Sequence, residues 1–288
     1  MRLRPRHVTA SLAIALGLLA GTSAAVEPAA LDARAAALRA ELGSAFTVAA
    51  EPPFVVIGDE PAAVVRERCR STVRWAVARL KQDYFTREPE EIVEIWLFRD
   101  RASYERHLRE RFDEAPVSPY GFFSHRHGAL FMNISTGSGT LVHEIVHPFL
   151  RADFPTCPAW FNEGLASLYE QCAEEDGHIV GRVNWRLPGL QERIRAGSVP
   201  TFLHLTGLSN AEFYGEPDGY SVHYGQARYL CFYLQERGLL RKFYAKFRAS
   251  AATDPTGYST VQRILGVDDM AAFQRDWEAF VLRRRFPE

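Results

Sequence analysis

The chain has 288 residues, 47% of them hydrophobic, and its 34 basic residues nearly balance its 35 acidic ones. This length allows one large domain or two small ones with a real hydrophobic core. The sequence contains no basic stripe and no long run of like charges. Nucleic acid is therefore not expected as a partner.

The first 25 residues have the features of a secretory signal peptide. Arg2, Arg4 and Arg6 precede the apolar run VTASLAIALGLLA, and small residues up to Ala25 supply a cleavage site. Cleavage there leaves 263 residues (288 minus 25), with 31 basic residues against 35 acidic ones. We therefore predict an exported protein, periplasmic or extracellular, with no stable membrane insertion after cleavage. An uncleaved membrane anchor is the alternative.

The remaining chain changes from mixed strands and helices to helices alone. Apolar periodicity predicts helices over 31–42, 62–85 and 101–112, strands over 54–59 and 91–98, and a hairpin of 120–124 with 128–134. From Thr140 onward the pattern is almost wholly helical, with Gly and Pro interruptions at 177–181, 188–200 and 215–219. Strands followed by helices are typical of an α+β fold. We predict a single domain over 26–288, with a sheet-containing half (26–134) and a helical half (135–288).

Export would permit disulfides among the four cysteines, Cys69, Cys157, Cys172 and Cys231. Cys157 and Cys172 flank a segment with a helical pattern, and about twelve helical residues separate their ends by roughly 18 Å. A disulfide requires Cα atoms within about 7 Å of each other. This pairing is therefore not expected, whereas the other pairings and free buried thiols remain open.

The segment TLVHEIVHPFL (140–150) places two histidines four residues apart on a predicted helix. Side chains at positions i and i+4 project from the same side of a helix, and two neutral imidazoles there suit zinc. The glutamate after the first histidine can reach a water molecule at the ion but not the ion itself. We therefore predict His143 and His147 as zinc ligands and Glu144 as general base. Two histidines on a solvated helix face are the alternative.

A catalytic zinc site needs a third protein ligand. The segment AWFNEGLASLYE (159–170) offers Glu163 on a second predicted helix, far enough after His147 for a turn and an antiparallel return. A carboxylate within such an apolar segment is costly to bury unless a positive charge meets it. Glu163 is therefore the predicted third ligand, and an ordinary solvated helix carboxylate is the alternative.

HEIVH followed by WFNEGLA resembles the gluzincin metallopeptidases, in particular the peptidase MA-like domains of exported bacterial proteins. The resemblance covers roughly 120–288 and includes YSVHYGQARYLCFYLQERG (220–238). It implies a zincin-like fold with a small twisted sheet, a helical half and a cleft between them. It also implies Zn²⁺ bound by the three residues above, and an edge strand at 128–134 along which a peptide substrate lies.

The resemblance further implies that Tyr224 hydrogen-bonds the oxyanion that develops during peptide hydrolysis. His223 is a second candidate for this donor, and both side chains could instead be structural. GSG at 137–139 lacks the lysine of a phosphate-binding loop and is predicted to be a flexible lead-in to the histidine-bearing helix.

Two features depart from the family pattern. Pro148 cannot donate a hydrogen bond to the carbonyl of Glu144, and it disfavours α geometry at His147. We expect a kink or an early helix end just past His147, with both histidines still in place. The strand at 128–134 has no acidic residue to hold a free substrate amine, which favours an endopeptidase over an aminopeptidase.

The sequence thus predicts an exported zinc metallopeptidase that hydrolyses a peptide or protein substrate with zinc-activated water. The alternative is a non-catalytic binding protein of the cell envelope that kept a peptidase scaffold.

Overall fold

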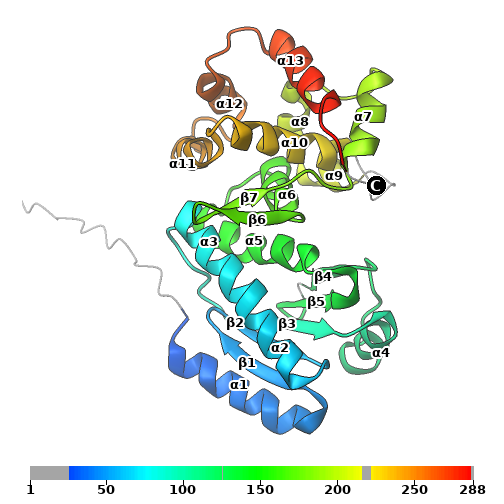
Figure 1. Ribbon diagram of the computed structural model, residues 1–288. Coiled ribbons are helices and arrows are strands. Elements are labelled where there is room, and N and C mark those ends of the chain that lie inside the picture. Colours follow the sequence, from blue (N-terminus) through cyan, green and yellow to red (C-terminus); the bar gives the residue numbers. More distant parts are fainter. Residues whose placement is uncertain (1–25, 125, 216–221, 287–288) are drawn as a thin grey trace, which may run out of the picture.

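The computed structural model describes residues 26–124, 126–215 and 222–286, so the predicted signal peptide lies outside the described residues. The fold is α+β, as predicted. Figure 1 shows the sheet with its helices in the lower part and the C-terminal helices in the upper part, with α5 (Gly139–Asp153) between them. Within the described ranges, no helix is both long and apolar enough to cross a membrane.

The main sheet has five strands in the order β1-β2-β3-β5-β4. The strands are β1 (Thr47–Glu51), β2 (Phe54–Gly58), β3 (Val93–Phe98), β4 (Gly121–Ser124) and β5 (Ala129–Asn133). β2, β3 and β5 are parallel, whereas β1 and β4 are antiparallel strands at the two edges. β1 was not predicted, because its sequence TVAAE has little apolar alternation and it becomes a strand by pairing with β2.

The strand at 128–134 is not the edge of the sheet, and this expectation from the family resemblance is wrong. β5 lies between β3 and β4, and all its residues are buried. The hairpin folds back so that β4 covers the outer side of β5. The accessible edge is therefore β4, whose sequence GFFS also contains no acidic residue.

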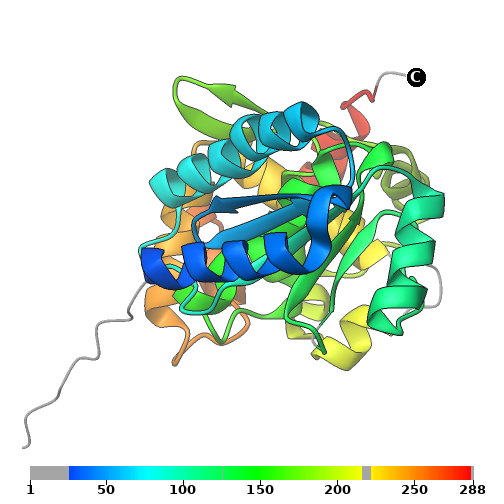
Figure 2. The same ribbon diagram turned by 90° about the horizontal axis from the view of Figure 1, so that it is seen from below.

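Helices cover both faces of this sheet, which explains why its central strands are almost continuously apolar. One face packs against α1 (Pro28–Leu42) and α4 (Arg101–Phe112), and Figure 2 shows α1 lying over this side. The other face packs against α5 and a long helix built from α2 (Ala62–Arg68), the π-helical segment η2 (Cys69–Arg74) and α3 (Trp75–Asp83). Along β3, Ile95 and Leu97 belong to the core on the α5 side, whereas Trp96 and Phe98 belong to the other.

The C-terminal half is mainly helical but contains a hairpin that was not predicted. β6 (Cys172–Glu175) and β7 (His178–Gly181) are antiparallel and joined by Asp176 and Gly177, whose φ angles are 51° and 79°. An Asp-Gly pair with positive φ at both residues is a strong hairpin signal. The hydrophobic pattern around it did not indicate strands, because Glu174 and Glu175 are exposed.

The other elements of this half are helices. They are α6 (Ala159–Leu168), α7 (Leu187–Arg195), α8 (Phe202–Gly207), α9 (Asn210–Tyr214), α10 (Val222–Glu236), α11 (Leu240–Ser250), α12 (Tyr258–Leu265) and α13 (Met270–Leu282). Helix α7 occupies much of the interruption predicted at 188–200, because Leu190 and Ile194 pack into the core. The interruption predicted at 215–219 lies almost entirely outside the described residues. All four cysteines are free thiols.

Helix α5 contains Pro148 but does not end there. It continues to Asp153, so of the two outcomes expected just past His147, a kink or an early helix end, the early end is wrong. A proline inside a helix costs about 3 kcal/mol or more. The next two side chains, Phe149 and Leu150, are buried in the core, and each contributes about 1.5–3 kcal/mol. Tertiary packing therefore offsets the local penalty.

Candidate functional site

Helices α5 and α6 bring the three predicted ligands together. One ligand atom from each of His143, His147 and Glu163 lies within 4.8 Å of the others. The Nε2 atoms of His143 and His147 lie 3.4 Å and 4.0 Å from Glu163 Oε2. His143 and Glu163 are buried and His147 is nearly so. The three residues form a group that could bind a metal ion, as the sequence predicted.

Two glycines allow this arrangement, because each lies where a side chain would collide. A Cβ atom on Gly139, the first residue of α5, would lie 1.9 Å from the carbonyl oxygen of Glu170. A Cβ atom on Gly164 would lie 3.0 Å from the carbonyl oxygen of Ala227 on α10. Close packing against the chain after α6 therefore explains the glycine at position 139, the last residue of the GSG segment.

Each histidine has a hydrogen-bonding or charged neighbour behind it. His147 Nδ1 lies 3.0 Å from Asn162 Oδ1, which accepts its proton and leaves Nε2 free to bind a metal. His143 Nδ1 lies 3.5 Å from Glu170 Oε1. Both partners belong to the segment AWFNEGLASLYE, but the sequence analysis assigned a role only to Glu163. Their roles depend on the approach of α6 to α5, which spacing along the chain does not reveal.

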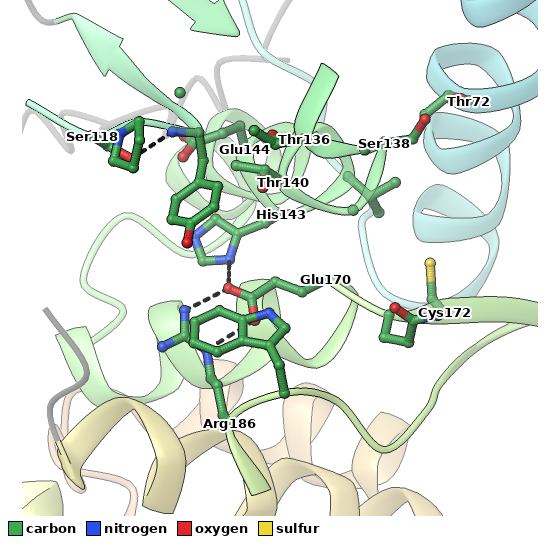
Figure 3. A pocket seen from close by; sticks show the side chains of 18 of the residues that line it. Thr72, Ser118, Thr136, Ser138, Thr140, His143, Glu144, Glu170, Cys172 and Arg186 are labelled. Carbon is green, nitrogen blue, oxygen red and sulfur yellow. Dashed lines mark hydrogen bonds and ion pairs between the residues drawn. The ribbon is translucent and has the colours of Figure 1, made fainter. Parts of the chain in front are cut away.

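Glu170 is held by Arg186, a residue that the sequence analysis also missed. The guanidinium Nη2 and Nε atoms lie 2.6 Å and 2.8 Å from the two carboxylate oxygens, and Asn184 Nδ2 donates a further hydrogen bond of 2.9 Å. Figure 3 shows the resulting chain from Arg186 through Glu170 to His143. Burial raises the pKa of Glu170, but Arg186 and His143 outweigh it and lower the pKa to about 2. Glu170 is therefore anionic and positions His143.

The charges of the metal-binding group depend on one another. Burial raises the pKa of Glu163, but His147 and His143 outweigh it and lower the pKa to about 2. Burial lowers the pKa of His143, but hydrogen bonds to Glu163 and Glu170 outweigh it and raise the pKa to about 10. The site therefore favours a positive charge between these side chains. Two imidazoles and a carboxylate are a known donor set for zinc, so the residues fit this ion.

Two tyrosines lie at the site. Tyr214, at the end of α9, donates a 2.8 Å hydrogen bond to Glu163 Oε1, the oxygen turned away from the histidines. Tyr224 is in the first turn of α10, and the centre of its ring lies 5.1 Å from the guanidinium carbon of Arg186. It lines the cavity that is described below. Burial and the charge of Glu163 raise the pKa of both hydroxyls, so both stay protonated donors. Tyr224 was predicted at the site, whereas Tyr214 was not.

His223, the second donor candidate, is buried, and its ring packs 5.7 Å from the ring of Phe213. It is not among the residues that line the cavity next to the metal-binding group. The structure therefore supports the structural interpretation of His223.

A cavity of about 1050 Å³ opens beside this group, between the two halves of the chain. His143 and Glu144 line it, together with Glu170 and Arg186 across from them (Figure 3). The sheet-containing half contributes residues 71, 72, 75 and 117–121. The rest of the lining comes from 136–140, 142–144, 170–172, 185–186, 213–214 and 224. The predicted base thus lies at the surface of a space large enough for a substrate.

Comparison with known proteins assigns no family to the chain. No protein-family model matches it, and no curated protein matches it significantly in sequence.

Proposed function

We propose that this protein is an exported zinc metallopeptidase of the gluzincin type that cleaves peptide bonds within a chain. One observation carries the proposal. His143, His147 and Glu163 form a buried metal-binding group, and Glu144 lines a large cavity directly beside it. The resemblance of HEIVH and WFNEG to gluzincin motifs supports the same assignment.

The residues of the site divide the chemistry among them. Zinc, when bound, would polarise the substrate carbonyl and lower the pKa of water to about 7. Glu144 takes the proton of the attacking water and returns it to the leaving amine. Tyr224 donates a hydrogen bond to the carbonyl oxygen as negative charge develops on it. Asn162 and Glu170 keep the Nε2 atoms of the histidines directed at Glu163.

The architecture supports a zincin-like fold. The histidine-bearing helix α5 lies between the mixed sheet and the helical half, and the cavity lies between those halves. Residues 117–121 lead into the edge strand β4 and line the cavity. An edge strand whose outer side has no partner among the described strands of the sheet can pair with a substrate in an extended conformation.

The preference for cleavage within a chain rests on the carboxylates of the site. Neither β4 nor β5 contains an acidic residue. Glu170, the acidic residue across the cavity, is already bound by Arg186 through both oxygens. The described lining therefore offers no carboxylate dedicated to a free substrate amine.

The test is zinc analysis combined with hydrolysis of a peptide library. We expect about one zinc per chain, hydrolysis of blocked peptides as well as free ones, and loss of hydrolysis on chelation with recovery on zinc addition. Zinc without hydrolysis of any peptide would favour the non-catalytic binding protein. Strict release of single N-terminal residues would contradict the endopeptidase assignment.

A further inference from the structure

Exposed apolar and aromatic side chains gather around the cavity. Among the described residues, eight large hydrophobic side chains are exposed, and four of them line it: Val117, Tyr120, Trp185 and Tyr214, with exposed fractions of 78%, 41%, 40% and 47%. Single exposed apolar residues are normal on a protein surface, whereas a gathered set indicates a binding site. Two of these residues come from each half of the chain, so the apolar surface belongs to both sides of the cavity.

The charges of the cavity are already engaged. Its acidic, basic and histidine lining residues are His143, Glu144, Glu170 and Arg186. Arg186 and Glu170 pair with each other, and His143 and Glu144 belong to the proposed catalytic group. In the described part of the lining, no further Lys, Arg, Asp or Glu is available to a charged substrate side chain. Such a side chain would lose its hydration without gaining a partner.

The remaining polar groups of the lining are uncharged, and besides the backbone and the Gln171 amide they include several hydroxyls. These hydroxyls belong to Ser71, Thr72, Ser118, Thr136, Ser138 and Thr140. Figure 3 shows Thr72 on the side toward Cys172 and Ser118 on the opposite side, with His143 between them. Hydroxyls both donate and accept hydrogen bonds, so they suit the amides of a peptide backbone on either side of the bond that is cut.

We propose that this cavity selects peptide segments with large, uncharged apolar or aromatic side chains next to the cleaved bond, and that Trp185 and Tyr120 contact those side chains. This inference rests on the proposed peptidase function and names its substrate class. A cavity of about 1050 Å³ exceeds the space that one side chain needs, so it accommodates several substrate residues. Burial of one large apolar side chain changes binding by about tenfold or more.

The experiment measures binding to the zinc-loaded Glu144→Gln variant, which does not depend on turnover. Fluorescent blocked peptides of equal length differ only in two central residues, which are Phe-Leu, Ser-Ser, Lys-Lys or Asp-Asp. We expect the Phe-Leu peptide to bind at least tenfold more tightly than the Lys-Lys and Asp-Asp peptides. Equal or tighter binding of either charged peptide overturns the inference. Wild-type protein that binds Phe-Leu peptides but hydrolyses none would contradict the proposed function alone.

A pair of variants locates the selection. Trp185→Ala should weaken binding of the Phe-Leu peptide about tenfold and leave binding of the Ser-Ser peptide unchanged. The matched control is Leu203→Ala on α8, because Leu203 is 62% exposed and does not line the cavity. Since the Trp185 ring stacks 4.2 Å from the Arg186 guanidinium, zinc content is measured in each variant. Tyr120→Ala repeats the test from the sheet-containing half. If both Trp185→Ala and Tyr120→Ala keep the wild-type preference for the Phe-Leu over the Ser-Ser peptide, Trp185 and Tyr120 do not contact the apolar side chains and this assignment is overturned.

Discussion

Two buried carboxylates close to α5, Asp153 and Glu163, have different kinds of partners. At the end of the helix, Asp153 Oδ1 accepts hydrogen bonds from Thr86 N, Thr86 Oγ1 and Arg87 N at 3.0, 2.8 and 2.9 Å. Its other oxygen accepts from Tyr244 and forms an ion pair with Arg248. Asp153 thus obtains its full set of partners, including a permanent cation, from the chain itself.

Glu163, beside the first half of α5, has no such cation. Its ion-pair partners among the described residues are two imidazoles, and its remaining hydrogen bond comes from Tyr214. Histidine is neutral when it binds a metal, so a bound ion would then compensate the Glu163 charge in place of a protonated imidazole. The comparison indicates that Asp153 joins two parts of the fold, whereas Glu163 belongs to a group that could bind a metal ion. The following substitutions test this distinction.

The largest effect is expected for Glu163→Gln. The amide is a weak neutral donor in place of a charged one, so the variant should lose nearly all its zinc and all detectable peptide hydrolysis. Zinc is measured by elemental analysis and the fold by circular dichroism. The matched control is Glu175→Gln on the exposed β6–β7 hairpin, which should keep both properties. Full zinc occupancy in Glu163→Gln would exclude it as a ligand.

Glu144→Gln should have the opposite signature. Glu144 lines the cavity, and residue i+1 cannot reach an ion held by residues i and i+4 of the same helix. The variant should therefore keep its zinc while turnover falls by about 10²–10⁴, the usual contribution of a positioned proton acceptor. Turnover and zinc content are measured on the same sample. Loss of zinc, or full activity, would show that Glu144 has another role.

Asp153→Asn should reduce stability and leave zinc binding unchanged. Breaking a buried ion pair by removing one partner costs about 3–5 kcal/mol, because the other charge is left uncompensated. Arg248 is partly exposed, which places the expected loss near the lower value. Urea unfolding of the zinc-bound protein gives the free energy, and zinc titration gives the affinity. If Asp153→Asn kept its stability but bound zinc more weakly, Asp153 would support the metal-binding group and not the fold.

The same residue predicts a pH dependence. Burial raises the pKa of Asp153, but hydrogen bonds from Tyr244 and Thr86 outweigh it, so the net shift is downward. A carboxyl group with a lowered pKa contributes stability above its unfolded value of about 3.9, and this contribution is lost as pH falls through the folded pKa. Below about pH 4, wild-type stability should therefore fall more steeply than that of Asp153→Asn. Parallel curves from denaturant titrations in chelator would contradict this.

Tyr214→Phe should have a smaller effect on the metal. Removing the hydroxyl frees the outer oxygen of Glu163, and loss of such a partner typically weakens metal binding 10–100-fold. Because Tyr214 is half exposed, water can replace part of the bond, and we expect about tenfold weaker zinc binding in a chelator competition. Tyr224→Phe is the matched control, with unchanged zinc affinity but slower turnover. Equal affinities in both variants would exclude a role for Tyr214 in holding Glu163.

The smallest effect is expected for Pro148→Ala. The helical turn from His143 to His147 does not use the nitrogen of residue 148, and α5 already continues past it. Zinc affinity should remain within about twofold of the wild type. A large gain in affinity would mean that the proline distorts the natural site, and it would support the non-catalytic binding protein.

Local geometry explains which parts of this site could be predicted from the sequence. The spacing of His143 and His147 fixes their common face once the segment is helical, and Glu144 follows from the same rule. The apolar periodicity likewise predicted β2, β3 and the β4–β5 hairpin, because strands have a two-residue repeat that the sequence shows directly. β1, with the sequence TVAAE, has no such pattern. It forms a strand because it pairs with β2.

Only the tertiary structure decided the rest. The chain could have placed β5 or β4 at the sheet edge, and pairing in space determined that β4 is outside. Asn162, Glu170, Arg186 and Tyr214 meet the metal-binding group through helix packing and loops, not through a repeat along the chain. Their spacing carries no periodic signal, because contacts between elements depend on how those elements pack. The sequence by itself therefore determined that His143 and His147 share one face of a helix, and packing determined which side chains surround them.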